Sequence, residues 1–185
     1  MKFLKIILIL FISLNTSVKA DSKKNIIESL KEGGKLIFIR HAYAPGGGDP
    51  ENFSINDCST QRNLSEGGRL QSKKIGEFFR ENNIKIKNIY SSEWCRCKET
   101  ASIAFKNFEI KSFLNSFFSF KFEHNRKNQM ANFQKFLLEW DKKSNLIFVT
   151  HYVVISEILG YPSSSGEIVI ANKNLKIIDT LKIEY

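Results

Sequence analysis

The sequence predicts an α/β protein: a three-layer sandwich with a mostly parallel central sheet covered by helices on both faces. Short apolar runs of strand length, at residues 35–40 and 145–150, alternate with longer segments of helical period. Such alternation is typical of a parallel sheet buried on both faces. Both runs lead directly into a histidine, His41 and His151. Because ligands in open α/β sheets bind beyond the carboxyl ends of the strands, we expect a functional site there.

The first elements flank a long loop. A weak helical pattern over residues 22–31 ends at two glycines, a common helix stop. After the first strand, the Pro- and Gly-rich residues 45–50 indicate that residues 42–63 form a loop. Ser65 is a good N-cap for an amphipathic helix that extends to residue 82.

The remaining elements continue the alternation of strands and helices. We expect strands at 89–91, 109–112 and 145–150, helices at 94–105, 129–140 and 153–159, and a final hairpin of strands 166–171 and 175–183. Residues 113–126, rich in Phe and polar residues, match neither period.

The first twenty residues have the pattern of an export signal. Lys2 and Lys5 precede an apolar run, and the small residues around Ala20 offer a cleavage site. The run is shorter than the roughly 20 residues of a membrane span. We therefore expect an exported protein, periplasmic or secreted, with a single domain over residues 21–185 and no stable membrane span after cleavage. An uncleaved N-terminal anchor is the alternative.

The chain is basic, with a formal net charge of +9. Cleavage after residue 20 would remove three lysines and no acid, which leaves +6. This charge favours anionic substrates and partners. No compact cluster of Lys and Arg with interleaved aromatic residues occurs, so we expect no nucleic-acid partner.

Three cysteines, Cys58, Cys95 and Cys97, are present in a chain expected to meet an oxidising compartment. Cys95 and Cys97 are too close in sequence to be the preferred pair. A disulfide from Cys58 to one of them is therefore expected, with three buried free thiols as the alternative. Zinc is disfavoured because no CxxC pair or nearby histidine completes four ligands.

A set of histidines and arginines suits phosphoryl transfer. A neutral imidazole such as His41 is a competent nucleophile towards phosphorus. Arginines at positions 40 and 96, with Arg62 in the long loop, would grip phosphoryl oxygens with their planar donors. Their charge would also keep His41 unprotonated near neutral pH. His151 could donate a hydrogen bond to a phosphoryl oxygen, so the scheme needs no metal or other cofactor.

Taken singly, each residue has an ordinary structural interpretation. A histidine at a strand end is usually structural, Arg96 alone is typical of a surface charge on a helix, and Arg62 alone is typical of a solvated loop residue. His124 has no partner motif, and we expect it to be structural. The functional prediction depends on the joint pattern.

Four segments in order resemble the histidine phosphatase superfamily, which has the phosphoglycerate-mutase-like α/β fold. Residues 36–42 (LIFIRHA) are similar to its Arg-His-Gly signature, with Ala in place of Gly. Residues 64–71 (LSEGGRLQ) are similar to its Leu-Thr-x-x-Gly-x-x-Gln helix start. Residues 90–101 (YSSEWCRCKETA) resemble its Ser-Ser-x-x-x-Arg-x-x-x-Thr-Ala segment, and 148–151 (FVTH) its Val-x-His strand end.

The resemblance implies roles for the same residues. His41 would be the phosphorylated nucleophile, Arg40 and Arg96 would bind the phosphoryl group, and His151 would complete the pocket. Arg62 lies near a loop that contributes a further phosphate contact in relatives. Its neighbours Gln61 and Asn63 cannot be separated from it by sequence.

The sequence departs from the family at the proton donor. Many relatives place a glutamate after the third strand in a Leu-x-Glu context, where this chain has Leu114-Asn115-Ser116. Glu123 or Asp57 could replace it, and spacing does not choose between them. A phosphatase without a strong acid is expected to favour good leaving groups, such as phosphohistidine or an acyl phosphate.

Three functions remain in view. The leading prediction is a metal-independent phosphatase that forms a phosphohistidine and acts on a small phosphorylated substrate or an envelope glycolipid phosphate. A phosphomutase is less favoured, because the chain lacks room for large lid insertions. A catalytically inactive phosphate-binding protein is the rival from another class.

Overall fold

The computed structural model describes residues 24–185. The export signal expected in residues 1–20 lies outside the described residues. In the described part, residues 24–32 form a helix, and a six-stranded sheet follows in the order β3-β2-β4-β1-β5-β6. The strands are β1 (Leu36–Arg40), β2 (Asn88–Ser91), β3 (Glu109–Ile110), β4 (Leu146–Thr150), β5 (Ile168–Ala171) and β6 (Ile177–Leu181).

The sheet is parallel over its first four strands. β1 pairs with β4, β4 with β2 and β2 with β3, all in parallel. β5 then pairs antiparallel with β1 and with β6, as expected of a terminal hairpin. This topology confirms the predicted mostly parallel α/β sheet.

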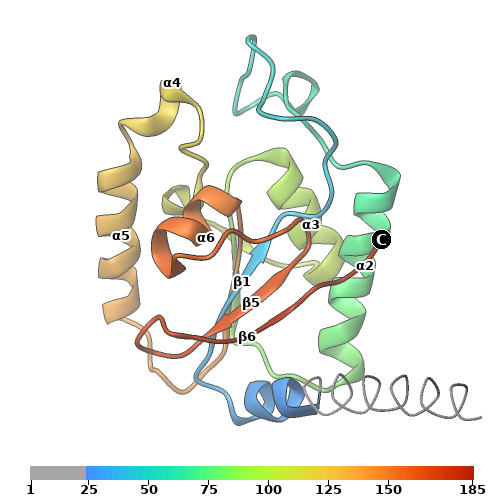
Figure 1. The fold of residues 1–185 in the computed structure, drawn as a ribbon, viewed down its shortest axis with the longest axis vertical. Coiled ribbons are helices and arrows are strands. Elements are labelled where there is room, and N and C mark those ends of the chain that lie inside the picture. Colours follow the sequence, from blue (N-terminus) through green and yellow to red (C-terminus); the bar gives the residue numbers. More distant parts are fainter. Residues whose placement is uncertain (1–23) are drawn as a thin grey trace, which may run out of the picture.

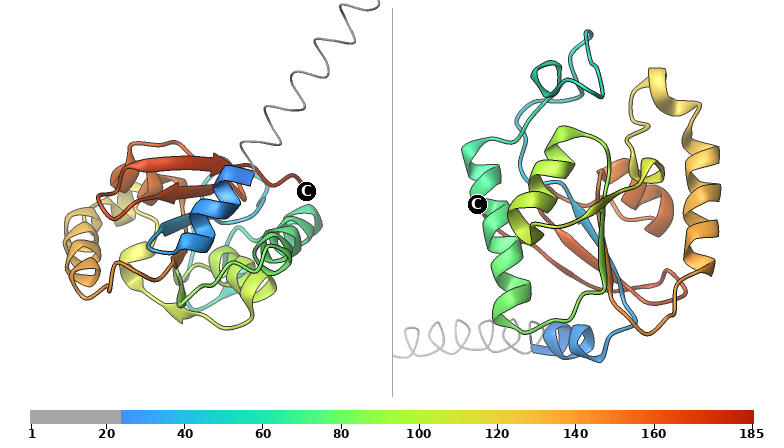
Figure 2. Two further views of the ribbon diagram at one scale, coloured as in Figure 1. Left: turned by 90° about the horizontal axis from the view of Figure 1, so that it is seen from below. Right: turned by 180° about the vertical axis from the view of Figure 1, so that it is seen from behind.

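Helices cover both faces of the sheet (Figure 1). The longer ones are α2 (Glu66–Glu81), α3 (Cys95–Phe105), α5 (Arg126–Leu138) and α6 (Tyr152–Leu159). α2 and α3 lie together on one side of the sheet, and α5 and α6 on the other, as the views from below and behind also show (Figure 2). The three layers are therefore those that the sequence predicts.

Alternation along the strands explains these layers. Ile37 and Ile39 of β1 pack into the core beneath α2 and α3, whereas Leu36 and Phe38 pack into the core beneath α5. Successive side chains of a strand point to opposite faces, so a continuous apolar run fills two cores. Phe38 and Phe148 stack across the sheet with ring centroids 5.1 Å apart.

Residues 109–126 differ most from the sequence expectation. The third strand ends at Ile110 rather than 112, because Ser112–Leu114 turn as a 3-10 helix that buries Phe113 and Leu114. A single helical turn, α4 (Phe120–Glu123), follows, and α5 begins at Arg126 rather than 129. The apolar side chains that force these turns meet partners far away in sequence, so the local pattern did not predict them.

The long loop is confirmed and contains a short 3-10 turn, Cys58–Thr60. It rises above the carboxyl edge of the sheet (Figure 1). Ser65 caps α2 as expected, since its hydroxyl accepts a hydrogen bond from the Gly68 amide. None of the helices in residues 24–185 is long and apolar enough to cross a membrane.

Candidate active site

The paired strands β1 and β4 bring the two predicted histidines together. Arg40 and Thr150 are register partners, and the His41 amide continues the pairing with a 2.8 Å hydrogen bond to the Thr150 carbonyl. His41 and His151 therefore leave the sheet side by side, with ring centroids 5.5 Å apart. Both rings are almost fully buried.

The protonation of His41 follows from its contact with a carbonyl group. Nδ1 lies 2.8 Å from the Ala42 carbonyl oxygen. A carbonyl only accepts, so Nδ1 carries the proton and Nε2 keeps its lone pair. Burial lowers the pKa of His41 well below its usual value, and the charges of Arg96, Arg40 and Arg62 lower it further. His41 thus has the tautomer and the charge state of a nitrogen nucleophile.

His151 has the opposite tautomer. Its Nδ1 lies 3.4 Å from Arg96 Nη2, which only donates, and its Nε2 lies 3.0 Å from the Ser92 hydroxyl. His151 therefore accepts at Nδ1 and donates at Nε2. Burial, together with Arg96 and His41, holds its pKa well below the usual value.

The third strand end supplies Arg96. The Ser92 amide donates to the Val149 carbonyl, which extends the pairing of β2 with β4, and α3 begins at Cys95. Arg96 in the first turn of α3 consequently points into the site, with 3% of its side chain exposed. The next turn links α3 to the histidines, because Thr100 donates to the Arg96 carbonyl and accepts from the Ala42 amide.

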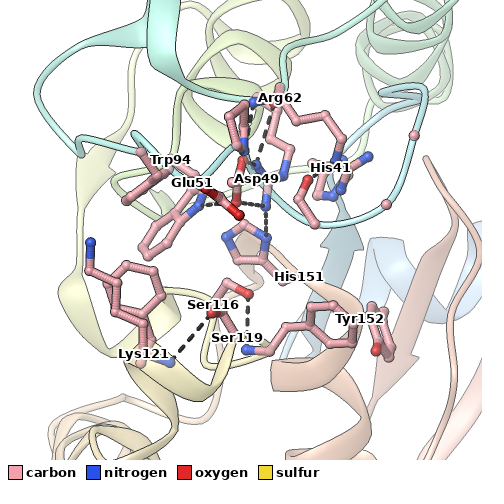
Figure 3. Close-up of a pocket in the computed structure, with 18 of the residues that line it drawn as sticks. His41, Asp49, Glu51, Arg62, Trp94, Ser116, Ser119, Lys121, His151 and Tyr152 are labelled. Carbon is pink, nitrogen blue, oxygen red and sulfur yellow. Dashed lines mark hydrogen bonds and ion pairs between the residues drawn. The ribbon is translucent and has the colours of Figure 1, made fainter.

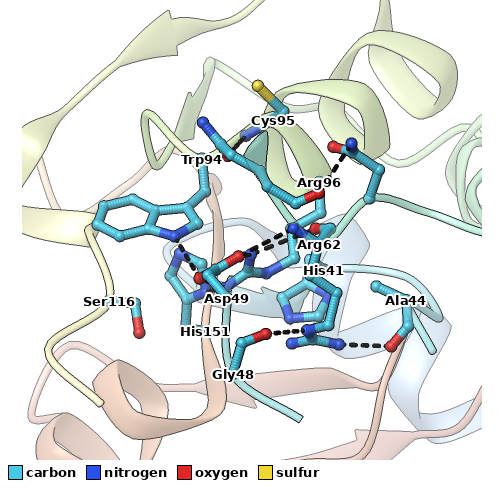
Figure 4. Close-up of polar contacts among 12 residues, drawn as sticks. His41, Ala44, Gly48, Asp49, Arg62, Trp94, Cys95, Arg96, Ser116 and His151 are labelled. Carbon is cyan, nitrogen blue, oxygen red and sulfur yellow. Dashed lines mark hydrogen bonds and ion pairs between the residues drawn. The ribbon is translucent and has the colours of Figure 1, made fainter. Parts of the chain in front are cut away.

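Asp49 of the long loop occupies the centre of the site (Figure 4). Its oxygens lie 2.6 Å from Arg96 Nη1 and 3.2 Å from Nη2, and they also accept from the Trp94 indole and the Arg62 amide. Burial alone would raise the Asp49 pKa, but the hydrogen bonds and charge of Arg96 outweigh burial and lower it. The carboxylate is therefore ionised at neutral pH.

Arg40 and Arg62 complete the positive side of the site. Arg40 donates to the Ser163 carbonyl at 2.8 Å, and its guanidinium lies over the Tyr152 ring. Arg62 donates from Nε to the Gly48 carbonyl at 2.8 Å and from Nη1 to the Ala44 carbonyl. The Nε groups of Arg40 and Arg96 are buried and lack a hydrogen-bond acceptor among the described residues. Unpaired buried donors of this kind suit an anionic ligand.

A disulfide ties the long loop to α3. Cys58 and Cys95 are bonded, with Cα atoms 5.7 Å apart, and the Cys95 amide also donates to Gln61. Of the two pairings that the sequence left open, this selects Cys95. Cys97 is a buried free thiol 3.5 Å from His151, and burial raises its pKa to about 12. It therefore remains protonated.

The two histidines, the three arginines and Asp49 line one cavity of about 320 Å³ (Figure 3). The five residues predicted from the sequence as the phosphate pocket all line it: Arg40, His41, Arg62, Arg96 and His151. Aromatic side chains form much of the outer wall, where Phe53 stacks on Trp94 and meets Phe122 edge to face. The cavity thus combines a cluster of arginines and histidines with a partly aromatic wall, which also carries charged residues such as Glu51 and Lys121.

The remaining candidates lie elsewhere. Asn63 donates to the Cys58 and Gln61 carbonyls, and so supports the loop rather than lining the cavity. Asp57 is exposed and caps the short 3-10 turn through Ser59, and Glu123 is exposed on α4. Neither candidate acid lines the cavity. Ser116, at the position where the resemblance places a glutamate, does line it.

Two carboxylates in the cavity were missed by the sequence reasoning. Asp49 and Glu51 both line it, on the loop segment that also carries Gly46 to Gly48. The glycines marked this segment as a loop, but nothing in the sequence linked Asp49 to Arg96, 47 residues away. Within residues 24–185, no group of three or more His, Cys, Asp or Glu side chains is arranged to hold a metal ion.

Comparison with known proteins supports the resemblance. Residues 36–117 match the profile of the Histidine phosphatase superfamily (branch 1). Serine/threonine-protein phosphatase Pgam5, mitochondrial, of Drosophila virilis is 31% identical over 84 residues, which are 45% of this chain. The match spans only 25% of the length of that relative.

Solved structures share the fold at low sequence identity. The protein histidine phosphatase SixA complexed with tungstate has a TM-score of 0.57 at 13% identity, covering 80% of this chain and 96% of that one. TTHB049 from Thermus thermophilus has a TM-score of 0.58 at 12% identity, covering 80% and 99%. The predicted phosphoglycerate-mutase-like fold is therefore confirmed.

Proposed function

We propose that the chain is a phosphatase of the histidine phosphatase superfamily, whose profile residues 36–117 match, and that it works through a phosphohistidine on His41. The observation that carries this proposal is the state of His41. Its Nδ1 is held by the Ala42 carbonyl, so Nε2 is an unprotonated nucleophile in a cavity with three arginines. A protein that only bound phosphate would not need this tautomer.

The first step forms a bond between His41 Nε2 and phosphorus. The bond from phosphorus to the leaving oxygen or nitrogen breaks, and the leaving group keeps the electron pair. Arg40, Arg62 and Arg96 would neutralise the charge on the remaining phosphoryl oxygens, where positioned charge contributes most. In the second step water attacks phosphorus, the bond to Nε2 breaks, and inorganic phosphate leaves.

The leaving group determines the substrate preference of this scheme. Asp57 and Glu123 do not line the cavity, and Ser116 carries no carboxyl group. Of the two carboxyl groups that do line it, Asp49 is paired with Arg96 and Glu51 is exposed to solvent. The leaving group would take its proton largely from solvent, so we propose a preference for aryl phosphates, acyl phosphates and phosphohistidine over alkyl phosphates. Comparable turnover of alkyl and aryl monophosphates would contradict this preference.

We also propose a cell-envelope phosphate as the physiological substrate, with the protein exported to the periplasm or secreted. The support is the signal-like pattern of residues 1–20 and the positive net charge. Localisation of the tagged full-length chain by fractionation tests this part. A cytosolic pool carrying an intact N-terminus would count against it.

The test of the catalytic proposal is hydrolysis of p-nitrophenyl phosphate by the wild type and by His41→Ala. We expect the variant to lose activity by about a thousandfold or more, since the covalent step is removed. Quenching the wild type in alkali or SDS, in which phosphohistidine survives, should trap phosphate on His41 that later acid treatment releases. The matched control is His124→Ala, which changes an exposed histidine outside the cavity and should retain full activity. An inactive wild type that still binds phosphate would instead support the binding protein.

A further inference from the structure

The Asp49 carboxylate occupies the donors that an incoming phosphoryl group would need. Its two oxygens face both terminal nitrogens of Arg96, at 2.6 Å and 3.2 Å. This two-point geometry is the one with which a guanidinium also grips phosphate oxygens. Asp49 is thus placed as an anion would be, close to both His41 and His151 (Figure 4).

The same turn of the chain also engages a second arginine. The Gly48 carbonyl accepts from Arg62 Nε at 2.8 Å, and the Arg62 amide donates to Asp49 at 3.1 Å. Two adjacent loop residues therefore engage two of the three arginines in the cavity. The donors of Arg96 and Arg62 cannot serve these partners and a phosphoryl group together at full strength.

The turn has room to move away. Gly46 and Gly48 on its N-terminal side adopt positive φ angles of 87° and 71°. A Cβ atom added to Gly47 or Gly48 would meet nothing within 4 Å, so this side of the turn is open. Glycines allow large φ and ψ changes at little steric cost. Departure of Asp49 would therefore require no repacking of the core.

We propose that Asp49 is an internal competitor for the phosphate site, released from Arg96 when a phosphoryl group binds. The proposal deepens the proposed phosphatase function and rests on it for its physiological meaning. Asp49 would set substrate affinity, because only ligands that bind the arginines better than the carboxylate does can enter. It would also speed product release, since its return to Arg96 displaces inorganic phosphate.

The expected size of the effect follows from occupancy. If Asp49 holds Arg96 in about nine molecules of ten, the apparent affinity for an anion is reduced about tenfold. Asp49→Asn keeps the size of the side chain and an acceptor for Trp94, but removes the charge. We expect it to bind inorganic phosphate about tenfold more tightly than the wild type in calorimetric titrations.

The matched control is Glu51→Gln. It removes one negative charge from the same loop and the same cavity, and Glu51 makes no salt bridge with Arg96 in the described structure. We expect a change of about threefold or less, as for a solvent-screened charge. Equal tightening in both variants, or no tightening in Asp49→Asn, would overturn the proposal. Absence of phosphate binding from all three proteins would also overturn it.

A second measurement leaves Asp49 unchanged. The Trp94 indole donates to Asp49 at 3.0 Å, and the only other tryptophan is Trp140. In Trp140→Phe, added phosphate should change Trp94 emission and saturate at the concentration found by calorimetry. Phosphate binding that leaves Trp94 emission unchanged would show that Asp49 stays in place, as a residue that only positions Arg96.

Hydrolysis assays on the same proteins separate this proposal from the phosphatase proposal. If both proposals hold, Asp49→Asn should lower KM for p-nitrophenyl phosphate and strengthen inhibition by inorganic phosphate. Tighter phosphate binding in a protein without hydrolysis would retain the competitor and reject the phosphatase. Hydrolysis with unchanged phosphate affinity would retain the phosphatase and reject the competitor.

Discussion

Two walls of the cavity are built in different ways. The sheet wall consists of Arg40, His41, Arg96 and His151, which lie at or after the ends of β1, β2 and β4. The loop wall consists of residues 46–51 and Arg62. The sheet wall is aligned by strand pairing, such as the hydrogen bond between the His41 amide and the Thr150 carbonyl. The loop wall depends on a disulfide, on Gln61 and on Asp49.

The difference assigns separate tasks to the two walls: the sheet wall carries the reacting groups, and the loop wall controls the access of substrate to them. The paired strands hold their backbone in a buried network of hydrogen bonds. The histidine and arginine side chains of the sheet wall therefore have a fixed geometry. A loop held by a few side-chain contacts can open locally at a low cost in free energy. The nucleophile lies on the rigid wall, and the carboxylate that fills the site lies on the movable one.

The largest effect is expected where the two walls meet, at the pair of Arg96 and Asp49. Arg96→Ala removes a phosphate ligand and should lower kcat/KM for p-nitrophenyl phosphate by about a thousandfold. It also removes the hydrogen bonds from Arg96 to Asp49. Because the open turn lets the unpaired Asp49 move towards solvent, the free energy of unfolding should fall by only about 1–3 kcal/mol. Kinetics and urea unfolding measure the two losses.

Arg69→Ala is the control for this change. Arg69 pairs with Glu99 at 2.6 Å, but its side chain is 50% exposed. An exposed ion pair contributes about 0–1 kcal/mol, so this variant should remain stable and active. Similar losses in both arginine variants would contradict the special role of Arg96.

A smaller effect is expected when the loop wall is loosened. Replacing Cys58 and Cys95 together by serine removes the link between the loop and α3. Stability should fall by about 2–4 kcal/mol, because the unfolded chain gains freedom. KM should rise more than kcat falls, since the loop wall carries Arg62 but not the nucleophile. A variant that loses kcat at unchanged KM would show that the loop wall also positions the sheet wall.

The smallest effect is expected for the dependence of hydrolysis on pH, which is set by the two histidines of the sheet wall. The pKa values of His41 and His151 are held well below 6.5 by burial, and nearby arginines add to this. Hydrolysis should therefore not lose its nucleophile as the pH falls through 6.5, where a free histidine becomes protonated.

The stability of the fold, unlike the state of the nucleophile, should depend on pH over the same range. The unfolded histidines take up protons below about 6.5 while the folded ones do not, so unfolding becomes more favourable as the pH falls. The melting temperature should decrease from pH 7 to 5, and the decrease should be smaller in His41→Gln. An activity profile with a midpoint near 6.5 would indicate an ordinary, exposed His41.

The sheet wall could be predicted from the sequence because it depends on local patterns. The apolar runs before His41 and His151 fixed the strands, and parallel pairing then placed both histidines at one edge. Arg96 was found because it follows the second strand within a helix start. Each inference needed only the strand period and the rule that sites lie at carboxyl ends.

The loop wall could not be predicted in the same way. Asp57 and Glu123 were proposed as acids from their residue type, and the structure places both outside the cavity. Asp49 was not proposed, because a loop has no period that aims its side chains. The choice between Cys95 and Cys97 also depended on how the loop crosses α3.

The sequence by itself determined the α/β class, the elements that end in His41 and His151, and the arginines that could accompany them. Strand and helix periods can be seen in short stretches of sequence, and parallel pairing then places the residues at the strand ends along one edge of the sheet. Only the tertiary structure decided which loop residues meet those arginines, because a carboxylate finds its partner through chain closure over long separations. The ion pair of Asp49 with Arg96 joins an arginine that the sequence predicted to a loop carboxylate that only the tertiary structure placed.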